Sequence, residues 1–154
     1  MDGQPKEINR LLVLVYQSIG RLEEHMLRKD SGFDLSISEI HFLETVGDDS
    51  ERYPLGKTVS ELAQALDITL PSVTLAANKL IRKGFLVKEK SARDGRVAHI
   101  NLTREGQKIY RLHRLFHLKM VSGVMEGMTK EELGVLMSGL RKLNDFLMIK
   151  VTQT

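Results

Sequence analysis

The stretch TVSELAQALDITLPSVTLAANKLIRKGFLVKEKSARDGRVAHINL, residues 58–102, decides the fold of this chain. Apolar residues at helical spacing on either side of residues 67–69 predict two short helices joined by a turn. Two runs rich in β-forming residues follow, 85–90 and 97–102, and Asp94-Gly95 between them predicts a tight turn. Helix, turn, helix and hairpin in this order indicate a winged helix-turn-helix. In that fold the second helix enters the major groove of DNA and the hairpin reaches the neighbouring minor groove.

Local signals place the ends of the helices. Three Ser or Thr residues are each followed three positions later by Glu, the capping-box pattern that starts a helix: Ser36 and Glu39, Thr58 and Glu61, Thr129 and Glu132. Thr69 is expected to cap the second helix of the motif, with Pro71 in the first turn, where a missing N–H has no partner to lose. Gly84 is expected just after that helix, because glycine accepts the left-handed conformation that ends many helices.

Long amphipathic helices are predicted on both sides of this segment, over about 5–29 and from Thr103 and Thr129 onward. The chain is therefore expected to be mainly α-helical with a small β-hairpin wing. A winged helix needs only roughly half of such a chain, so the terminal helices need another role. We expect an N-terminal helix of a dimerisation lobe (1–35), the winged helix-turn-helix (36–102) and C-terminal helices of the lobe (103–154). A two-fold dimer would present two recognition helices about 34 Å apart, one turn of DNA.

Composition excludes several classes of protein. The 154 residues include no cysteine, which excludes a disulfide framework, a zinc ribbon and a thiol nucleophile. There is no phosphate-binding loop, GxSxG or HExxH pattern, so we expect no enzyme and no catalytic residue. No apolar run approaches the roughly 20 residues that span a bilayer, and no secretory signal pattern opens the chain. A cytoplasmic protein without a membrane partner is expected.

The net charge of +3 is unevenly distributed along the chain. Residues 1–56 carry a net charge of −5, residues 57–119 carry +8, and residues 120–154 are neutral. Positive charge is thus concentrated on the predicted winged helix and on the helix that follows it. A polyanion such as double-stranded DNA is the partner that this distribution favours, with an ordinary solvated surface as the alternative.

Two stretches resemble the MarR family of bacterial transcriptional regulators, and the resemblance covers nearly the whole chain. DGRVAHINLT, residues 94–103, is similar to the wing pattern of the family, and LIRKGFL, residues 80–86, is similar to the segment between recognition helix and wing. The resemblance implies that Asp94 buttresses Arg96 and that Arg96 enters the minor groove. A narrow A·T minor groove has enhanced negative potential, which attracts guanidinium groups. Arg93 is expected to assist Arg96 or to contact phosphate.

The outer face of the recognition helix carries further candidates for contact with DNA. The set comprises Thr69, Ser72, Thr74, Leu75, Asn78, Lys79, Arg82 and Lys83. Asn78 has the groups to read adenine, whereas Arg82 and Lys83 suit phosphate. Members of the family often carry Arg where this chain has Leu75, so an Arg-to-guanine contact is not implied here. Leu75 is instead expected to meet a thymine methyl group, with plain exposed helix surface as the alternative.

Other stretches are similar to one branch of the family, the repressors of fatty-acid synthesis genes. They are SEIH (38–41), RLHR (111–114), FH (116–117) and MV (120–121). In that branch an acyl chain attached to acyl carrier protein acts as corepressor. The resemblance implies an apolar tunnel lined by Ile40, Leu43, Leu112 and Phe116. It also implies contact of the acidic carrier with Arg111 and Arg114.

Zinc sensing is the rival interpretation. His113 and His117 are four residues apart, so both project from one helical face and could hold one ion. Zinc-sensing members of the family place another ligand where this chain has His41, and Glu23 or Glu24 would complete the set, with Glu24 as our assignment. Three imidazoles and a carboxylate suit zinc. The remaining alternative is a buried hydrogen-bonded network that binds no metal.

The sequence therefore predicts a homodimeric regulator, most simply a repressor, that binds a pseudo-palindromic operator. No cofactor is required for that role, and zinc enters only with the rival interpretation. A protein-interaction module that uses a winged helix without binding DNA is the alternative from another class of protein.

Overall fold

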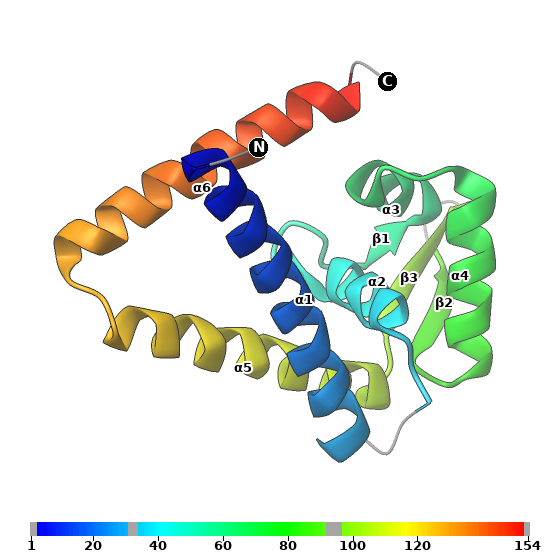
Figure 1. The fold of residues 1–154 in the computed structure, drawn as a ribbon. Coiled ribbons are helices and arrows are strands. Elements are labelled where there is room, and N and C mark those ends of the chain that lie inside the picture. The colour runs from blue at the N-terminus through cyan, green and yellow to red at the C-terminus, as the bar shows by residue number, and fades with distance from the viewer. Residues whose placement is uncertain (1–2, 31–33, 92–96, 153–154) are drawn as a thin grey trace. The chain divides into compact units, whose positions relative to one another are not determined.

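The computed structural model describes residues 3–30, 34–91 and 97–152, without the side chains of 27–30 and 150–152. Helices α1 (Gln4–Asp30) and α2 (Ile37–Gly47) precede the helix-turn-helix, and α5 (Arg104–Glu126) and α6 (Lys130–Thr152) follow the wing (Figure 1). The mainly helical chain with one small sheet confirms the predicted fold class.

The chain divides into two compact units, residues 1–116 and 117–154. The predicted segment boundaries differ from this division, since α1 and the first half of α5 belong with the winged helix. The physical reason is burial: Met26 of α1 and Gly106, Ile109 and His113 of α5 are all buried in the first unit. Amphipathic periodicity alone does not reveal which neighbour covers a helical face.

Helices α3 (Val59–Leu66) and α4 (Leu70–Arg82) form the predicted helix-turn-helix. The capping box at the start of α3 is confirmed: the Glu61 N–H donates to the Thr58 hydroxyl at 3.2 Å, and the Thr58 N–H donates to the Glu61 carboxylate at 2.7 Å. Asp67 ends α3 in the left-handed conformation, with a φ of 52°. Thr69 caps α4, and Gly84 follows it with a φ of 82°, as the sequence predicts.

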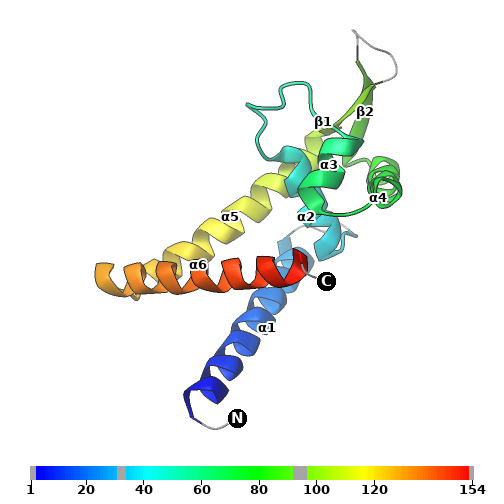
Figure 2. The ribbon, with the colours of Figure 1, turned by 90° about the horizontal axis from the view of Figure 1, so that it is seen from above.

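The sheet has three antiparallel strands in the order β1-β3-β2. Strands β2 (Leu86–Lys90) and β3 (Ala98–Leu102) form the wing, and β1 (Lys57–Thr58) pairs with β3 through Lys57 opposite Ile100. Strand β1 was missed by the sequence analysis, because two residues are too few to show an alternating pattern. Figure 2 shows α3 and α4 beside the sheet, consistent with the contacts of α3 with β1 and of α4 with β2.

One core holds the first unit together. Leu43 of α2, Leu62 of α3, Val73 and Leu80 of α4 and Ile100 of β3 are all at most 1% exposed. Burial of each such side chain contributes about 1.5–3 kcal/mol, so this cluster fixes how α2, α3 and α4 sit against the sheet. The inward faces predicted for the two helices of the motif, which comprise Val59, Leu62, Ala63, Leu66, Val73, Ala76, Ala77 and Leu80, all belong to or pack against this core.

The start of α5 is fastened to the start of the wing. Thr103 caps α5 by accepting from the Gly106 N–H at 3.1 Å, and its hydroxyl donates to the Gly84 carbonyl at 2.7 Å. The Thr103 N–H donates to the Phe85 carbonyl at 3.0 Å. The backbones of the α4–β2 turn and of α5 therefore lie in direct contact, and only glycine fits at position 106.

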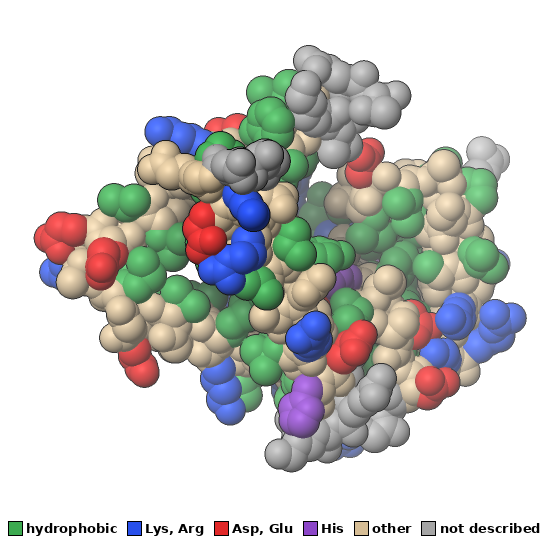
Figure 3. Space-filling view, in the orientation of Figure 1, with side chains coloured by type: hydrophobic (Ala, Val, Ile, Leu, Met, Phe, Trp, Pro, Cys, Tyr) green, Lys and Arg blue, Asp and Glu red, His purple; other side chains and the backbone are tan. Residues whose placement is uncertain are grey.

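Each unit leaves apolar side chains exposed on its terminal helices, and several are visible at the surface in Figure 3. In the first unit these include Ile8, Leu11, Leu12, Val15 and Leu22 of α1. In the second unit they include Val121, Val124, Met125, Val135, Met137, Leu140 and Leu147 of α5 and α6. Such runs of exposed apolar surface usually mark interaction sites. Among the described residues, no helix has both the length and the apolar character needed to cross a membrane.

Candidate nucleic-acid interface

Helix α4 presents an outward face whose hydroxyl groups already have partners. The Thr74 hydroxyl donates to the Leu70 carbonyl at 2.9 Å, and the hydroxyls of Thr69 and Ser72 lie 2.9 Å apart. Leu75 is 70% exposed in the middle of this face, and Asn78 is exposed one turn later. The face therefore offers a base edge an apolar side chain and an amide, which match a thymine methyl group and adenine.

The two lysines near the end of α4 are paired with a carboxylate of α2. Glu39 Oε1 lies 3.1 Å from Lys79 Nζ and 3.0 Å from Lys83 Nζ, and Lys83 also donates to the Asp34 carbonyl at 2.6 Å. Burial raises the pKa of Glu39, but the opposing effect of the Ser36 N–H and the two ammonium groups is larger. Together they bring the pKa down to about 2. The carboxylate is thus ionised at neutral pH. In Figure 3, acidic side chains lie beside basic ones on the α4 side of the first unit.

Further cations lie on the wing and at the end of α4. Arg82 is exposed, and Lys88 and Lys90 are exposed on the same side of β2, because alternate strand residues share a face. The sequence analysis did not single out Lys88 and Lys90, although their spacing of two within a predicted strand was the available signal. The predicted wing contacts Arg93, Asp94 and Arg96 lie outside the described residues.

A second group of polar side chains lies between α1, α2 and α5 of the first unit, with Glu23 and His113 buried and His41 exposed. Glu23 Oε1 lies 3.6 Å from Nε2 of both His41 and His113, and Glu44 Oε2 lies 3.3 Å from His113 Nδ1. The side chain of His113 is 2% exposed and that of Glu23 is 8% exposed. One ligand atom from each of Glu23, His41 and His113 falls within 4.8 Å of the others, a spacing at which they could hold one ion.

The carboxylate beside these histidines is Glu23, and not Glu24, which we assigned from the sequence. Glu23 is buried against the histidines, whereas Glu24 is exposed. Neighbouring residues of a helix point about 100° apart, so only one of the pair can face α2 and α5. Packing sets the rotation of α1 about its axis, and the sequence could not choose between them. His117 follows His113 by one turn of α5, begins the second unit and is half-buried.

The four residues predicted to line an acyl tunnel occupy two kinds of environment. Ile40 and Leu43 are 1% and 0% exposed and pack within the core. They do so because the apolar side of α2 is the side that covers α3 and α4. Leu112 and Phe116 of α5 are half-buried, and the Phe116 ring lies 6.2 Å from the His113 ring.

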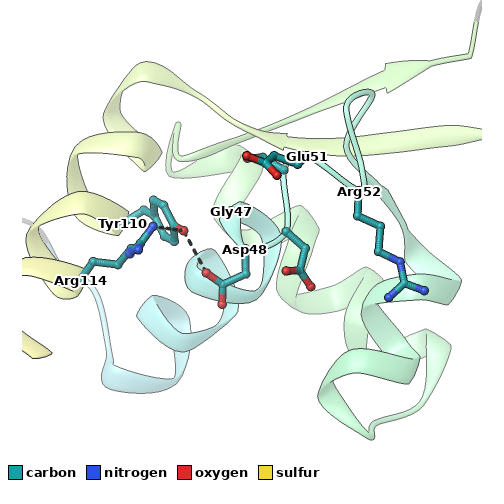
Figure 4. Close-up of a pocket in the computed structure, with 8 residues that line it drawn as sticks. Gly47, Asp48, Glu51, Arg52, Tyr110 and Arg114 are labelled. Carbon is teal, nitrogen blue, oxygen red and sulfur yellow. Dashed lines mark hydrogen bonds between the residues drawn. The ribbon is translucent and has the colours of Figure 1, made fainter. Parts of the chain in front are cut away.

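A polar cleft opens beside Tyr110, which the sequence analysis did not single out (Figure 4). It has a volume of about 750 Å³ and is lined by residues 47–52, Tyr110 and Arg114. The Tyr110 hydroxyl donates to Asp48 Oδ1 at 2.9 Å, and Arg114 donates to the Tyr110 oxygen at 3.2 Å. Arg111 lines a second cleft of about 520 Å³, which Tyr110 also lines. Both arginines predicted to meet an acidic carrier therefore flank polar hollows.

The family of the chain follows from comparison with known proteins. A model of the MarR family matches residues 33–97, from the start of α2 to the wing. FabT of Streptococcus pneumoniae, solved in complex with DNA, is 35% identical; the match covers 94% of this chain and 97% of that chain, with a TM-score of 0.84. The chain belongs to the MarR family. In a MarR-family regulator α4 is the recognition helix and β2 and β3 form the wing.

Two further relatives differ in what they support. S. aureus MepR, solved in complex with DNA, is 22% identical to this chain. The match covers 90% of this chain and 98% of that chain with a TM-score of 0.69, and it supports the fold alone. The Bacillus subtilis (strain 168) protein YhjH, an uncharacterised HTH-type transcriptional regulator, is 31% identical over 85 residues. That match covers 55% of this chain and about half, 46%, of the relative. Membership of the MarR family places the chain among transcription regulators and not among enzymes.

Proposed function

We propose that this chain is a homodimeric repressor that binds a pseudo-palindromic operator. The observation that carries the proposal is the exposed face of α4, with Leu75 and Asn78 exposed, within the segment 57–119 that carries a net charge of +8. The family match and the 35% identity to FabT, a protein solved on DNA, support the same conclusion. Phosphate contacts by Lys and Arg supply affinity, and contacts with base edges supply specificity.

The exposed apolar faces of α1, α5 and α6 support the dimer. Leu11 and Leu12 of α1 and Leu140 and Leu147 of α6 are 43–54% exposed in the single chain. A second copy of the chain would remove such surface from water, at about 25 cal/mol for each Å² buried. A closed two-fold dimer uses the same face on both copies, which matches a palindromic site.

We further propose that the regulated genes belong to fatty-acid synthesis and that acyl carrier protein brings the corepressor. The resemblance of residues 38–41 and 111–114 to that branch of the family supports this assignment. Arg111 and Arg114 are exposed beside the two polar clefts and carry charge opposite to that of an acidic carrier, while Asp48, Asp49 and Glu51 also line the first cleft. The acyl chain would need an apolar site other than the core positions of Ile40 and Leu43.

The experiment that tests the function is selection of genomic fragments by the purified protein at near-physiological salt, followed by sequencing. A shared palindrome upstream of fatty-acid synthesis genes supports the full proposal. A palindrome elsewhere supports the repressor and contradicts the gene assignment. If no fragment is enriched even with acyl carrier protein and zinc added, the chain is an interaction module and the proposed function fails.

The arrangement of Glu23, His41 and His113 favours zinc sensing as a second candidate function. Two imidazoles and a carboxylate suit zinc, and three protein ligands leave one position of a tetrahedral site to a further ligand. In calorimetric titration with zinc, His41→Ala is expected to weaken binding by at least about 10-fold, the loss that even an outer partner of a ligand can cause. His25→Ala, an exposed histidine of α1, is the matched control. Equal zinc affinity for both variants would contradict this candidate.

Contact of Leu75 with a thymine methyl group predicts a methyl-dependent operator affinity. Replacing the contacted thymine by uracil removes one methyl group, worth about 0.8 kcal/mol, so the wild-type protein should bind about fourfold more weakly per half-site. Leu75→Ala should bind both duplexes equally, whereas Ser72→Ala should keep the difference. Fluorescence anisotropy with singly substituted duplexes measures both effects. Uracil substitution without effect at every thymine of the operator would show that Leu75 reads no methyl group.

A further inference from the structure

Three cations lie at the end of the recognition helix, and two of them are held by one carboxylate. Lys79, Arg82 and Lys83 follow one another over five residues, but only Arg82 lacks an ion-pair partner among the contacts described for the first unit. Lys79 and Lys83 both approach the same oxygen of Glu39. Glu39 with its two lysines carries a net charge of +1, where two free lysines would offer +2 to DNA.

The Glu39 carboxylate is fixed in its place. The Ser36 N–H donates to Glu39 Oε2 at 2.8 Å, as part of the capping box that starts α2. Lys83 Nζ lies 3.1 Å from the same oxygen, and the Glu39 side chain is only 11% exposed. Lys79, whose side chain is 54% exposed, has more freedom than Lys83, at 26%. A carboxylate anchored in this way cannot follow the lysines toward a phosphate.

We propose that Glu39 withholds Lys79 and Lys83 from the phosphates of DNA and so limits sequence-independent binding. The inference rests on the proposed DNA binding. Non-specific affinity comes from phosphate contacts, so a protein that keeps two lysines paired gives up that affinity on every sequence alike. Contacts of Leu75 and Asn78 with bases then make up a larger part of the total binding energy.

The test is Glu39→Gln, compared with the wild type on an operator duplex and on a duplex of random sequence over a series of KCl concentrations. Glutamine keeps an oxygen that accepts from the Ser36 N–H, and it also suits a capping box, but it carries no charge. Release of two lysines should steepen the dependence of log affinity on log salt by about 1.8 per protomer. Affinity for the random duplex should rise at low salt, and affinity for the operator should rise by a similar factor.

Glu61→Gln is the matched control. Glu61 closes the equivalent capping box of α3 with Thr58, and no ion pair with a lysine is recorded for it among the described contacts. Glu61 belongs to the same winged helix. Glu61→Gln therefore tests whether the loss of any negative charge there steepens the salt dependence as Glu39→Gln should. The salt dependence of Glu61→Gln should stay within about 0.5 of the wild-type slope, well below the change expected for two phosphate contacts.

The double variant Lys79→Met/Lys83→Met makes the proposal independent of how well Glu39→Gln folds. Because the two lysines are withheld in the wild type, their removal should change the wild-type salt slope little. In the Glu39→Gln background the same removal should restore the wild-type slope, a coupling that a double-mutant cycle measures. A role of Glu39 in joining α2 to α4 alone predicts no such restoration.

The outcomes separate this inference from the proposed function. A steeper slope for Glu39→Gln that the lysine substitutions reverse supports the inference. An unchanged slope for Glu39→Gln, or a wild-type slope that falls by about 1.8 when the two lysines are removed, overturns it while DNA binding stands. If the wild type binds neither the selected operator nor random DNA at any salt concentration, the proposed function and the inference both fail.

Discussion

Replacing Leu140 and Leu147 together by Asp is expected to convert the proposed dimer to a monomer and to weaken operator binding by at least about 100-fold. The two residues are seven positions apart on α6, so they share a face, and they are 54% and 50% exposed in the single chain. A carboxylate in an apolar interface would have to be buried without a partner. A monomer carries only one recognition helix and can contact only one half-site of the operator. It therefore lacks the gain in affinity that comes from binding both half-sites at once.

Sedimentation equilibrium gives the oligomeric state, and anisotropy on a full operator and on a half-site gives the two affinities. Lys142→Glu and Lys142→Asp are the controls, because each changes the charge of the chain by as much as the two Leu→Asp substitutions together. Lys142 is exposed on α6, so both variants should leave the dimer and the full-site affinity intact. Half-site affinity should be the same for all the proteins. A double Asp variant that stays dimeric would show that this face of α6 lies outside the interface, and our assignment of the lobe would be wrong.

Gly106→Ala is expected to lower the free energy of unfolding by about 3 kcal/mol, the upper end for overpacking of a tight site. A Cβ atom at this position would lie 2.1 Å from the Phe85 carbonyl oxygen, a distance that only a shift of the backbone can relieve. That carbonyl accepts the Thr103 N–H, and the Thr103 hydroxyl holds the Gly84 carbonyl, so a shift would also break the contact between α5 and the wing.

Urea denaturation followed by circular dichroism measures this loss. Gln107→Ala, at the next and exposed position of α5, should change stability by no more than about 0.5 kcal/mol, as most surface substitutions do. Because the wing is positioned through the same contact, operator affinity of folded Gly106→Ala should also fall. A Gly106→Ala protein as stable as Gln107→Ala would mean that α5 and the α4–β2 turn do not approach each other as closely as described.

Much of the winged helix could be predicted from the sequence, because its boundaries depend on interactions within four residues. The capping boxes at Ser36 and Thr58, the Thr69 cap and the left-handed Gly84 all lie where local rules place them. A capping bond or a turn contributes its energy whatever the rest of the chain does. The recognition helix and the strands of the wing follow from those signals together with apolar periodicity.

The ion pairs of the described sites join residues that are far apart in the chain. Capping and periodicity rules concern near neighbours only, so they cannot predict these pairs. Lys83 meets Glu39 across 44 positions, and His113 meets Glu23 across still more. Periodicity shows that α1 has an apolar side, but it does not fix the helix rotation that turns Glu23 inward and leaves Glu24 exposed.

The sequence by itself thus determined the order of elements, the recognition helix, the concentration of positive charge and the residues that can face DNA. Only the tertiary structure decided that Glu39 holds two lysines of that interface, that Ile40 and Leu43 belong to the core, and that Phe85 fits against Gly106. The reason is physical: local signals act through bonds between near neighbours. The rotation and spacing of the helices come instead from close packing of side chains such as Leu43 and Leu80, which only the whole fold brings together.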